Sequence, residues 1–447
     1  MVESREASHA QPRPLRIAFL LYRGNPHSGG QGVYTKYLTR ELVRLGHSVE
    51  VFSGPPYPEL DEAVRLTKVP SLDLYREPDP FRVPRLREFQ TLADILEFVL
   101  MCTGAFPEPR SFGWRVASIL GCRLDEFDLI HDNQSLSWSV LRMQSRGMPV
   151  VTSIHHPITV DRRLGLQSAR TLKETVGLVR FYGFLRMQCA VARRLRRIIT
   201  VSHVSCADIC SEMAVDRSNI SVVPIGVDTD TFRPLPLIER RKGLIVTTAS
   251  ADVPLKGLRY LVEAVRLIKG RGDIEVEQKI IGARRSDSEV QRIVERYGLE
   301  EEVTFLGTLE QFEMVEHYAR ASVAVVPSLY EGFSLPTIEA MACRTPLVVT
   351  DGGALPEVVG VGGDCALIAR AGDAEDLAAK ISEVLLDPQA ALSRAANGLQ
   401  RVFDRYSWRA AAIDTVAVYE EVIDSNRSRV KAEDRLDDDV DGITGLR

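Results

Sequence analysis

Short apolar runs rich in β-branched residues alternate along the chain with longer segments in which apolar residues recur every three or four positions. The short runs have the composition of buried parallel strands, and the longer segments have the period of helices that cover a sheet. The predicted strands are residues 15–22, 48–53, 128–132, 150–155, 198–202, 221–225, 244–250, 278–281, 303–307, 323–327 and 346–350. This alternation predicts an α/β fold with doubly wound parallel sheets.

Three segments depart from the regular alternation. Residues 54–123 are rich in proline and irregular, with one amphipathic helix predicted at 92–101. Residues 169–197 form one long helical pattern. Residues 223–234 contain the proline, glycine and aspartate of a linker, and a second α/β set begins at Gly243. Because 447 residues exceed one ordinary core, the chain is expected to form two similar halves.

Composition excludes several classes of protein. Hydrophobic residues make up 45% of the chain and charged residues 26%, and the net charge of −5 gives no indication of nucleic-acid binding. The seven cysteines are scattered and include no CxxC pair, which argues against a disulfide framework or a zinc site. The N-terminus lacks the apolar core of a signal peptide, and no apolar run reaches the ~18 residues that span a bilayer. We therefore expect a cytoplasmic protein, and peripheral contact with the inner face of the membrane stays open.

The segment 328–342 combines the end of a strand, a loop and the start of a helix. Pro336 falls in the first turn of this helix, where its missing N–H costs least. A helix N-terminus presents free N–H groups and the positive end of the helix dipole, which together favour a phosphate or diphosphate. The candidate donors are the backbone N–H groups of Phe333, Ser334 and Leu335.

Glu331 lies before this helix and Glu339 inside it, up to ~12 Å apart at helical rise. Taken singly, each glutamate is more often a turn residue or a solvated helix position. Together, residues 331–336 and 339–342 resemble, almost residue for residue, the paired-glutamate signature of the retaining nucleotide-sugar glycosyltransferases of family 4. The resemblance implies a glycosyltransferase-B fold, in which two Rossmann-like domains face a central cleft. It also implies that a sugar binds at one glutamate and a ribose at the other.

The resemblance implies a donor site in the second half. Lys256 precedes a predicted helix and matches the family lysine that neutralises a diphosphate leaving group. Many relatives carry an arginine five residues earlier, where this chain has Ala251, so either Lys256 and the helix amides suffice or Arg284 supplies a second cation. The donor-binding residues expected from the resemblance, with Leu309 lining the nucleobase pocket, are Gly30, Ser250, Lys256, Gly282, Arg284, Leu309, Glu331, Gly332, Phe333, Ser334, Leu335 and Glu339.

The first half carries a glycine-rich turn and a histidine pair. Gly29 and Gly30 follow the first predicted strand, but the spacing is not G-x-G-x-x-G, which argues against a dinucleotide site. They resemble the family's glycine loop near the donor phosphates and the acceptor, although a tight turn is the simpler alternative. His155 ends the strand at 150–155 and resembles the family histidine that hydrogen-bonds the transferred sugar, with His156 as the second choice on the acceptor side. The implied catalytic residues are Glu331, His155 and Lys256.

Arginines are concentrated near the end of the long helical segment, at positions 186, 193, 194, 196 and 197. Cations in a last helical turn complement the helix dipole, and this is the preferred interpretation. The alternative is a patch for a membrane surface or an anionic acceptor.

The resemblance also suggests how the chain divides. We expect a flexible N-terminus at 1–14, an N-terminal acceptor domain at 15–230 completed by a C-terminal helix at 408–423, a C-terminal donor domain at 236–407, and a disordered acidic tail at 424–447.

The expected activity is retaining transfer of a hexose, mannose or glucose, from a nucleotide-diphosphate sugar to a hydroxyl of a sugar, polysaccharide or glycolipid, giving an α-glycosidic bond. GDP-mannose and UDP-glucose both fit as donors, with a slight preference for GDP-mannose. No cofactor or metal ion is expected, and a homodimer stays open. The alternatives are a nucleotide-sugar epimerase, a phosphorylase or a sugar-nucleotide-binding protein on the same fold.

Overall fold

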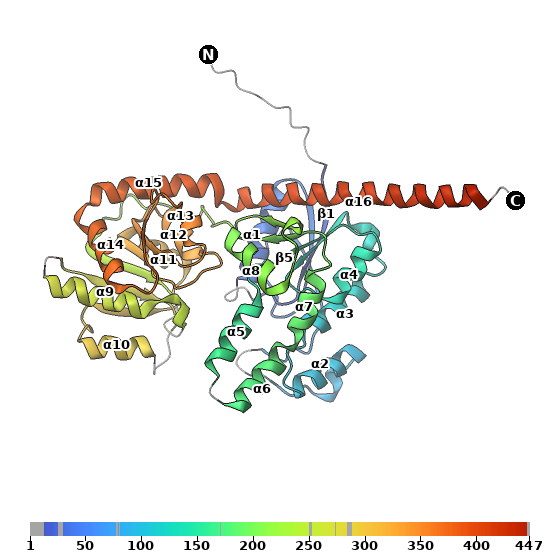
Figure 1. Ribbon diagram of the computed structural model, residues 1–447, viewed down its shortest axis with the longest axis horizontal. Helices are drawn as coiled ribbons and strands as arrows, with labels where there is room; N and C mark the ends of the chain where they lie inside the picture. Colours follow the sequence, from blue (N-terminus) through green and yellow to red (C-terminus); the bar gives the residue numbers. More distant parts are fainter. Residues whose placement is uncertain are drawn as a thin grey trace, which may run out of the picture. The chain divides into compact units, whose positions relative to one another are not determined.

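The computed structural model describes residues 13–25, 30–76, 79, 81–169, 171–249, 253–272, 274–283 and 288–444. The chain divides into two compact units (Figure 1). The first unit takes in the described residues up to Ile199, together with Cys210–Ser221 and the chain from Ala412 onward. The second unit consists of Thr200–Ile209 and Val222–Ala411.

The first unit is built on a seven-stranded sheet with the order β3-β2-β1-β4-β5-β6-β7. Its strands are β1 (Arg16–Leu21), β2 (Ser48–Ser53), β3 (Arg65–Lys68), β4 (Leu129–Asn133), β5 (Val150–Ser153), β6 (Ile198–Thr200) and β7 (Ile220–Val222). The pairs β1–β2, β1–β4, β2–β3, β4–β5 and β5–β6 are parallel. The strand order reverses between β1 and β4, and such a reversal is where doubly wound sheets bind ligands.

Helices follow most strands of this sheet. They are α1 (Gln31–Arg44), α2 (Leu92–Cys102), α3 (Glu108–Leu120), α4 (Trp138–Ser145), α5 (Ile158–Ser168), α6 (Leu172–Phe181) and α7 (Leu185–Ala192). Helix α8 (His203–Met213) is divided, because its residues up to Ile209 belong to the second unit and those from Cys210 onward to the first. The last helix, α16 (Trp408–Thr444), contributes its residues from Ala412 onward to the same unit.

The second unit is also built on a doubly wound sheet, which has six strands in the order β10-β9-β8-β11-β12-β13. Its strands are β8 (Arg241–Thr248), β9 (Glu277–Ile281), β10 (Val303–Gly307), β11 (Ala321–Val326), β12 (Leu347–Thr350) and β13 (Leu367–Ala369). Its helices are α9 (Leu258–Arg271), α10 (Glu289–Tyr297), α11 (Gln311–Arg320), α12 (Leu335–Ala342), α13 (Leu355–Val359), α14 (Ala374–Leu386) and α15 (Pro388–Arg405). The two doubly wound parallel sheets confirm the predicted fold class.

Strand β11 shows why its sequence is apolar at consecutive positions. Val323 and Val325 face a core shared with α9, α10 and α14, whereas Ala324 and Val326 face a second core shared with α11, α12, α13 and α15. Because side chains alternate across a strand, a sheet covered by helices on both faces needs an unbroken apolar run.

Helix α16 is tied to the first sheet by a buried polar contact. The Tyr419 hydroxyl bonds Nδ1 of His131 on β4, and Nε2 of His131 lies 2.7 Å from the Ser153 hydroxyl on β5. Burial lowers the pKa of His131 to about 3, so this imidazole is neutral at pH 7.

The structure differs from the sequence predictions in several elements. Within residues 54–123, β3 and α3 were not predicted. Strand β3 is a half-exposed edge strand with a basic residue at each end. Pro107 and Pro109 were expected to interrupt a helix, but they lie at the N-cap and in the first turn of α3, where proline is tolerated. The helical pattern of residues 169–197 is broken into α6, a 3₁₀ turn at Tyr182–Phe184, and α7. Helix α5 and the three-residue strand β13 are also additional.

The remaining predictions concern the two ends of the chain. Residues 1–12 of the expected flexible N-terminus lie outside the described residues. Helix α16 continues to Thr444, into the segment 424–447 for which disorder was predicted, and it passes the predicted helix end because no proline or glycine occurs between Trp408 and Gly442. None of the helices in the described parts of the chain is long and apolar enough to cross a membrane.

Candidate functional site

The loop between β11 and α12 is held in place within the second unit. The carbonyl oxygen of Gly332 accepts hydrogen bonds from the hydroxyls of Ser202 and Ser205, at 2.5 and 3.0 Å. The N–H of Ala354 donates to the carbonyl oxygen of Glu331 at 2.8 Å. These bonds satisfy the carbonyl groups of Glu331 and Gly332 and connect the loop to α8 and to the start of α13.

Glu331 forms a partly buried ion pair with Lys256. Nζ of Lys256 lies 2.7 Å from Oε1 of Glu331, and the Ser328 hydroxyl donates to the same oxygen at 2.7 Å. The Glu331 side chain is 10% exposed, whereas that of Lys256 is 32% exposed. Within the described residues Oε2 of Glu331 has no hydrogen-bond partner, so this oxygen is available to a ligand.

The backbone around Lys256 is fitted to the same loop. Lys256 ends a 3₁₀ turn at Pro254–Lys256, and the N–H of Leu329 donates to the carbonyl oxygen of Leu255 at 2.7 Å. Gly257 follows with φ +66°, and a Cβ atom there would lie 2.0 Å from the carbonyl oxygen of Pro327. Only glycine therefore lets the lysine approach Glu331 in this way.

The N-terminus of α12 carries unpaired N–H groups. In the part of the chain that the structure describes, the backbone N–H groups of Phe333, Ser334 and Leu335 donate to no protein acceptor. The Ser334 side chain does not cap the helix, because its hydroxyl instead accepts from the Thr337 hydroxyl at 2.8 Å. Three free donors at a helix N-terminus beside the Lys256 ammonium form a site for an anion.

Glu339 projects from α12 into a polar contact with Tyr318. The Tyr318 hydroxyl donates to Oε2 of Glu339 at 3.4 Å, and Thr248 Oγ1 lies 2.9 Å from the same hydroxyl. Burial raises the pKa of the Glu339 carboxyl to about 7, while the hydrogen bond from Tyr318 opposes this rise. Glu339 therefore changes charge near neutral pH.

Two further predicted donor-binding positions belong to the same unit. Gly282, at the end of β9, donates its N–H to the carbonyl oxygen of Gly307 at 2.8 Å, which fixes the start of the loop that contains Leu309. Leu309 packs with Phe333 and Leu335 against the core on the α12 side of the sheet.

In the first unit, His155 follows β5 and is held by Asn133 at the end of β4. Nε2 of His155 lies 2.7 Å from Oδ1 of Asn133, whose Nδ2 donates to the Thr35 hydroxyl at 3.1 Å. Burial lowers the pKa of His155 to about 4. Since Oδ1 can only accept, the neutral imidazole carries its proton on Nε2 and keeps a lone pair on Nδ1.

Sequence reasoning missed Asn133 and Gln134. The Gln134 side chain accepts the N–H of His155 at 3.0 Å and donates to the carbonyl oxygen of His156 at 2.8 Å, so it fixes the backbone of both histidines. The available signal was the polar sequence at the end of the strand predicted at 128–132, because neighbouring parallel strands end at the same edge of a sheet.

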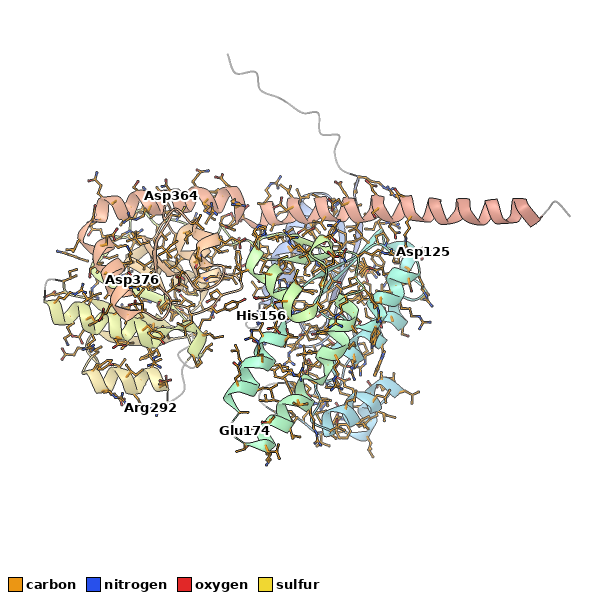
Figure 2. All side chains as sticks on the ribbon, viewed as in Figure 1. Asp125, His156, Glu174, Arg292, Asp364 and Asp376 are labelled. Carbon is orange, nitrogen blue, oxygen red and sulfur yellow. The ribbon has the colours of Figure 1, made fainter. Side chains whose placement is uncertain are left out.

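The remaining first-unit candidates differ in their surroundings. Gly30 is the N-cap of α1 with φ +72°, and nothing lies within 4 Å of the position that a Cβ would occupy. His156, labelled in Figure 2, is partly exposed, and its Nε2 lies 3.2 Å from Oδ1 of Asp161. His156 is therefore less firmly held than His155.

The comparisons with known proteins agree with the two halves of the chain. Residues 28–231 match the family described as Glycosyltransferase Family 4, and residues 236–401 match the family described as Glycosyl transferases group 1. A protein of Mycolicibacterium hassiacum named MMP alpha-(1->4)-mannosyltransferase is 45% identical over 92% of this chain and 98% of its own length. This chain belongs to glycosyltransferase family 4.

Two further proteins similar to this glycosyltransferase are more distant. A D-inositol 3-phosphate glycosyltransferase 2 of Catenulispora acidiphila is 26% identical over 93% of this chain and 97% of its own length. Among solved structures, sucrose-phosphate synthase of Thermosynechococcus elongatus has a TM-score of 0.68 at 23% identity and covers 92% of this chain and 100% of its own. At that identity the structural likeness establishes the fold alone.

Three residues predicted for the glycosyltransferase site, Gly29, Ser250 and Arg284, lie outside the described residues, as does Ala251. The described residues nevertheless bring together Lys256, Glu331 and the free N–H groups of the α12 N-terminus. A cation and oriented N–H groups stabilise negative charge, and a carboxylate oxygen accepts hydroxyl hydrogen bonds. This arrangement suits an enzyme that transfers a sugar to a sugar acceptor.

Proposed function

We propose that this enzyme transfers a mannosyl residue from GDP-mannose to a hydroxyl of a saccharide, with retention of configuration and formation of an α-(1→4) bond. The observation that carries the proposal is the Lys256–Glu331 pair beside the free N–H groups of α12. Mannose and the linkage are suggested by the name of the relative that is 45% identical. UDP-glucose is the competing donor.

The charges of the reaction account for the proposed roles. Breaking the anomeric C–O bond leaves positive charge on the sugar and negative charge on the diphosphate. Lys256 and the N–H groups of the α12 N-terminus stabilise the diphosphate, and Oε2 of Glu331 accepts hydrogen bonds from sugar hydroxyls. The acceptor hydroxyl attacks from the face that the diphosphate leaves, and a phosphate oxygen takes its proton.

His155 is proposed to bind the transferred sugar, as the family resemblance implies. Its Nδ1 lone pair is the acceptor for a sugar hydroxyl, because Nε2 is committed to Asn133. The lowered pKa keeps this lone pair available throughout the neutral range. His155 therefore orients the sugar and does not need to exchange a proton.

The direct test is product analysis with each donor. GDP-mannose or UDP-glucose is incubated with an oligosaccharide acceptor, and the anomeric configuration of the first product is read by NMR. We expect an α-mannoside from GDP-mannose and undiminished turnover in EDTA, because Lys256 and the N–H groups supply the positive charge that a metal ion would otherwise provide. A β-linked product would refute retention, and conversion of the donor without any acceptor would favour an epimerase.

The titration of Glu339 predicts that donor binding depends on pH. The family resemblance assigns this carboxylate to the ribose hydroxyls, and the ionised form is the stronger acceptor. With a pKa of about 7, raising the pH from 6 to 8 ionises most of the population and should strengthen GDP-mannose binding by up to about 10-fold. Isothermal titration calorimetry at the two pH values measures this change.

The matched control is Glu339→Gln, which cannot ionise. Its GDP-mannose affinity should be weaker at pH 8 and nearly constant between pH 6 and 8. GDP-mannose, not GDP, is the ligand in this titration, because the phosphates of GDP-mannose do not change their charge between pH 6 and 8. An unchanged pH dependence in the variant would assign the titration to another group.

A further inference from the structure

A groove of about 690 Å³ lies on the first unit, and none of the residues assigned above lines it. It is formed by α5, by α7 with its C-cap, and by Glu212 of α8. Its lining residues are Thr159, Arg162, Arg163, Leu166, Gln167, Leu185, Arg186, Cys189, Ala190, Arg193 and Glu212. Four arginines against one glutamate give the groove a positive charge.

Two of the four arginines have structural partners. Nε of Arg163 pairs with Oε1 of Glu212 at 3.0 Å, and Nε of Arg193 donates to the carbonyl oxygen of Met213 at 2.8 Å. Among the described residues, the side chains of Arg162 and Arg186 have neither a hydrogen bond nor an ion pair. These two guanidinium groups come from different helices, α5 and α7, and line the same groove.

The wall formed by α5 also contains buried donors without acceptors. Nε of Arg162 and Oγ1 of Thr159 are both buried and have no hydrogen-bond partner within the described residues. The two residues are three positions apart on α5, so they share one face of the helix. A buried unsatisfied donor costs free energy, which a ligand oxygen placed beside both groups would recover.

The floor of the groove is apolar. Leu166, Leu185 and Ala190 line it, and its volume lies within the range of small-molecule sites, roughly 300–1,000 Å³. A bare inorganic anion would leave most of this apolar surface uncovered. The lining therefore matches a ligand with an anionic head and an apolar part.

We propose that this groove binds a phosphate ester that carries an apolar chain. A phosphate group offers several acceptor oxygens for Arg162, Arg186 and Thr159, whereas a carboxylate offers two. The apolar chain covers Leu166, Leu185 and Ala190. The source of such a ligand is either a membrane lipid or a free phosphate ester, and both present the same chemistry.

Calorimetry on the full chain without any sugar nucleotide tests this proposal independently of the proposed transferase activity. Octyl phosphate should bind in a 1:1 complex, at least about 10-fold more tightly than inorganic phosphate, because only the ester also covers the apolar floor. Octyl glucoside has the same apolar chain without the negative charge. It should bind no more tightly than inorganic phosphate. Equal binding of octyl phosphate and octyl glucoside would overturn the proposal.

Variants locate the binding in the groove. Arg162→Gln with Arg186→Gln should weaken octyl phosphate binding at least 10-fold, since each lost charged hydrogen bond is worth about a factor of 10. Ala190→Trp should also weaken octyl phosphate binding at least 10-fold, because the indole ring would occupy the apolar floor of the groove. Arg292→Gln, an exposed arginine on α10 of the second unit (Figure 2), is the matched control and should leave binding unchanged. Full binding by both the double variant and Ala190→Trp, with circular dichroism unchanged, would refute the site.

A vesicle experiment distinguishes the two sources. A lipid headgroup is the ligand if the protein sediments with vesicles that contain phosphatidic acid but not with vesicles of phosphatidylcholine alone. In that case the double variant Arg162→Gln with Arg186→Gln should no longer sediment. Octyl phosphate binding without sedimentation identifies a free phosphate ester.

Discussion

Replacing Lys256 by alanine is expected to lower kcat for sugar transfer by about 100- to 1,000-fold, the usual effect of removing one group that stabilises transition-state charge. Lys256 is the cation fixed beside the α12 N-terminus, where negative charge develops on the departing diphosphate. Binding of the intact donor should weaken less, because the full charge appears only as the bond breaks. Initial rates of GDP release at saturating donor measure kcat directly.

The matched control for this substitution is Lys242→Ala. Lys242 lies exposed at the start of β8, with no ion pair among the described residues, so its loss should leave kcat within about twofold of wild type. Both variants should show the wild-type circular dichroism spectrum. Turnover of Lys256→Ala close to that of wild type would remove Lys256 from the proposed mechanism.

The residues that could be predicted from the sequence are those whose chemistry is encoded locally. The loop and helix at 331–342 form one continuous segment. Their proline, glutamates and free N–H groups could therefore be predicted from the sequence without knowledge of the fold. Lys256 lies 75 residues from Glu331, so the family resemblance placed both in the donor site, but the sequence did not predict the ion pair between them. That contact depends on Gly257 packing against the loop after β11.

The support of His155 illustrates what the sequence did not predict. Asn133 and Gln134 contact His155 because β4 and β5 pair in a parallel register with Asn133 opposite Ser153. Strand neighbours and register are set by the whole sheet, so no local pattern predicts these contacts. The arginine groove was not predicted either, because α5 was not expected and α7 was merged with α6 in one helical pattern.

Replacing Glu331 by alanine is the second change with a large expected effect, a loss of kcat of about 1,000-fold or more. The substitution removes Oε2, the proposed acceptor for sugar hydroxyls, and also removes the partner that holds Lys256. The same assay of GDP release measures the loss, and Glu300→Ala, an exposed glutamate of the second unit, is the control. Wild-type rates in Glu331→Ala would contradict the site assignment.

Combining the two substitutions separates the two roles of Glu331. If Glu331 served only to hold Lys256, Lys256→Ala with Glu331→Ala would be no slower than Lys256→Ala alone. We expect the double variant to be slower than either single variant, because Oε2 is free to bind the sugar whether or not Lys256 is present. The loss of kcat in the double variant should still be smaller than the product of the two single losses, because each single substitution already removes the ion pair through Oε1. A double variant equal to Lys256→Ala would restrict Glu331 to a positioning role and leave the sugar to other acceptors.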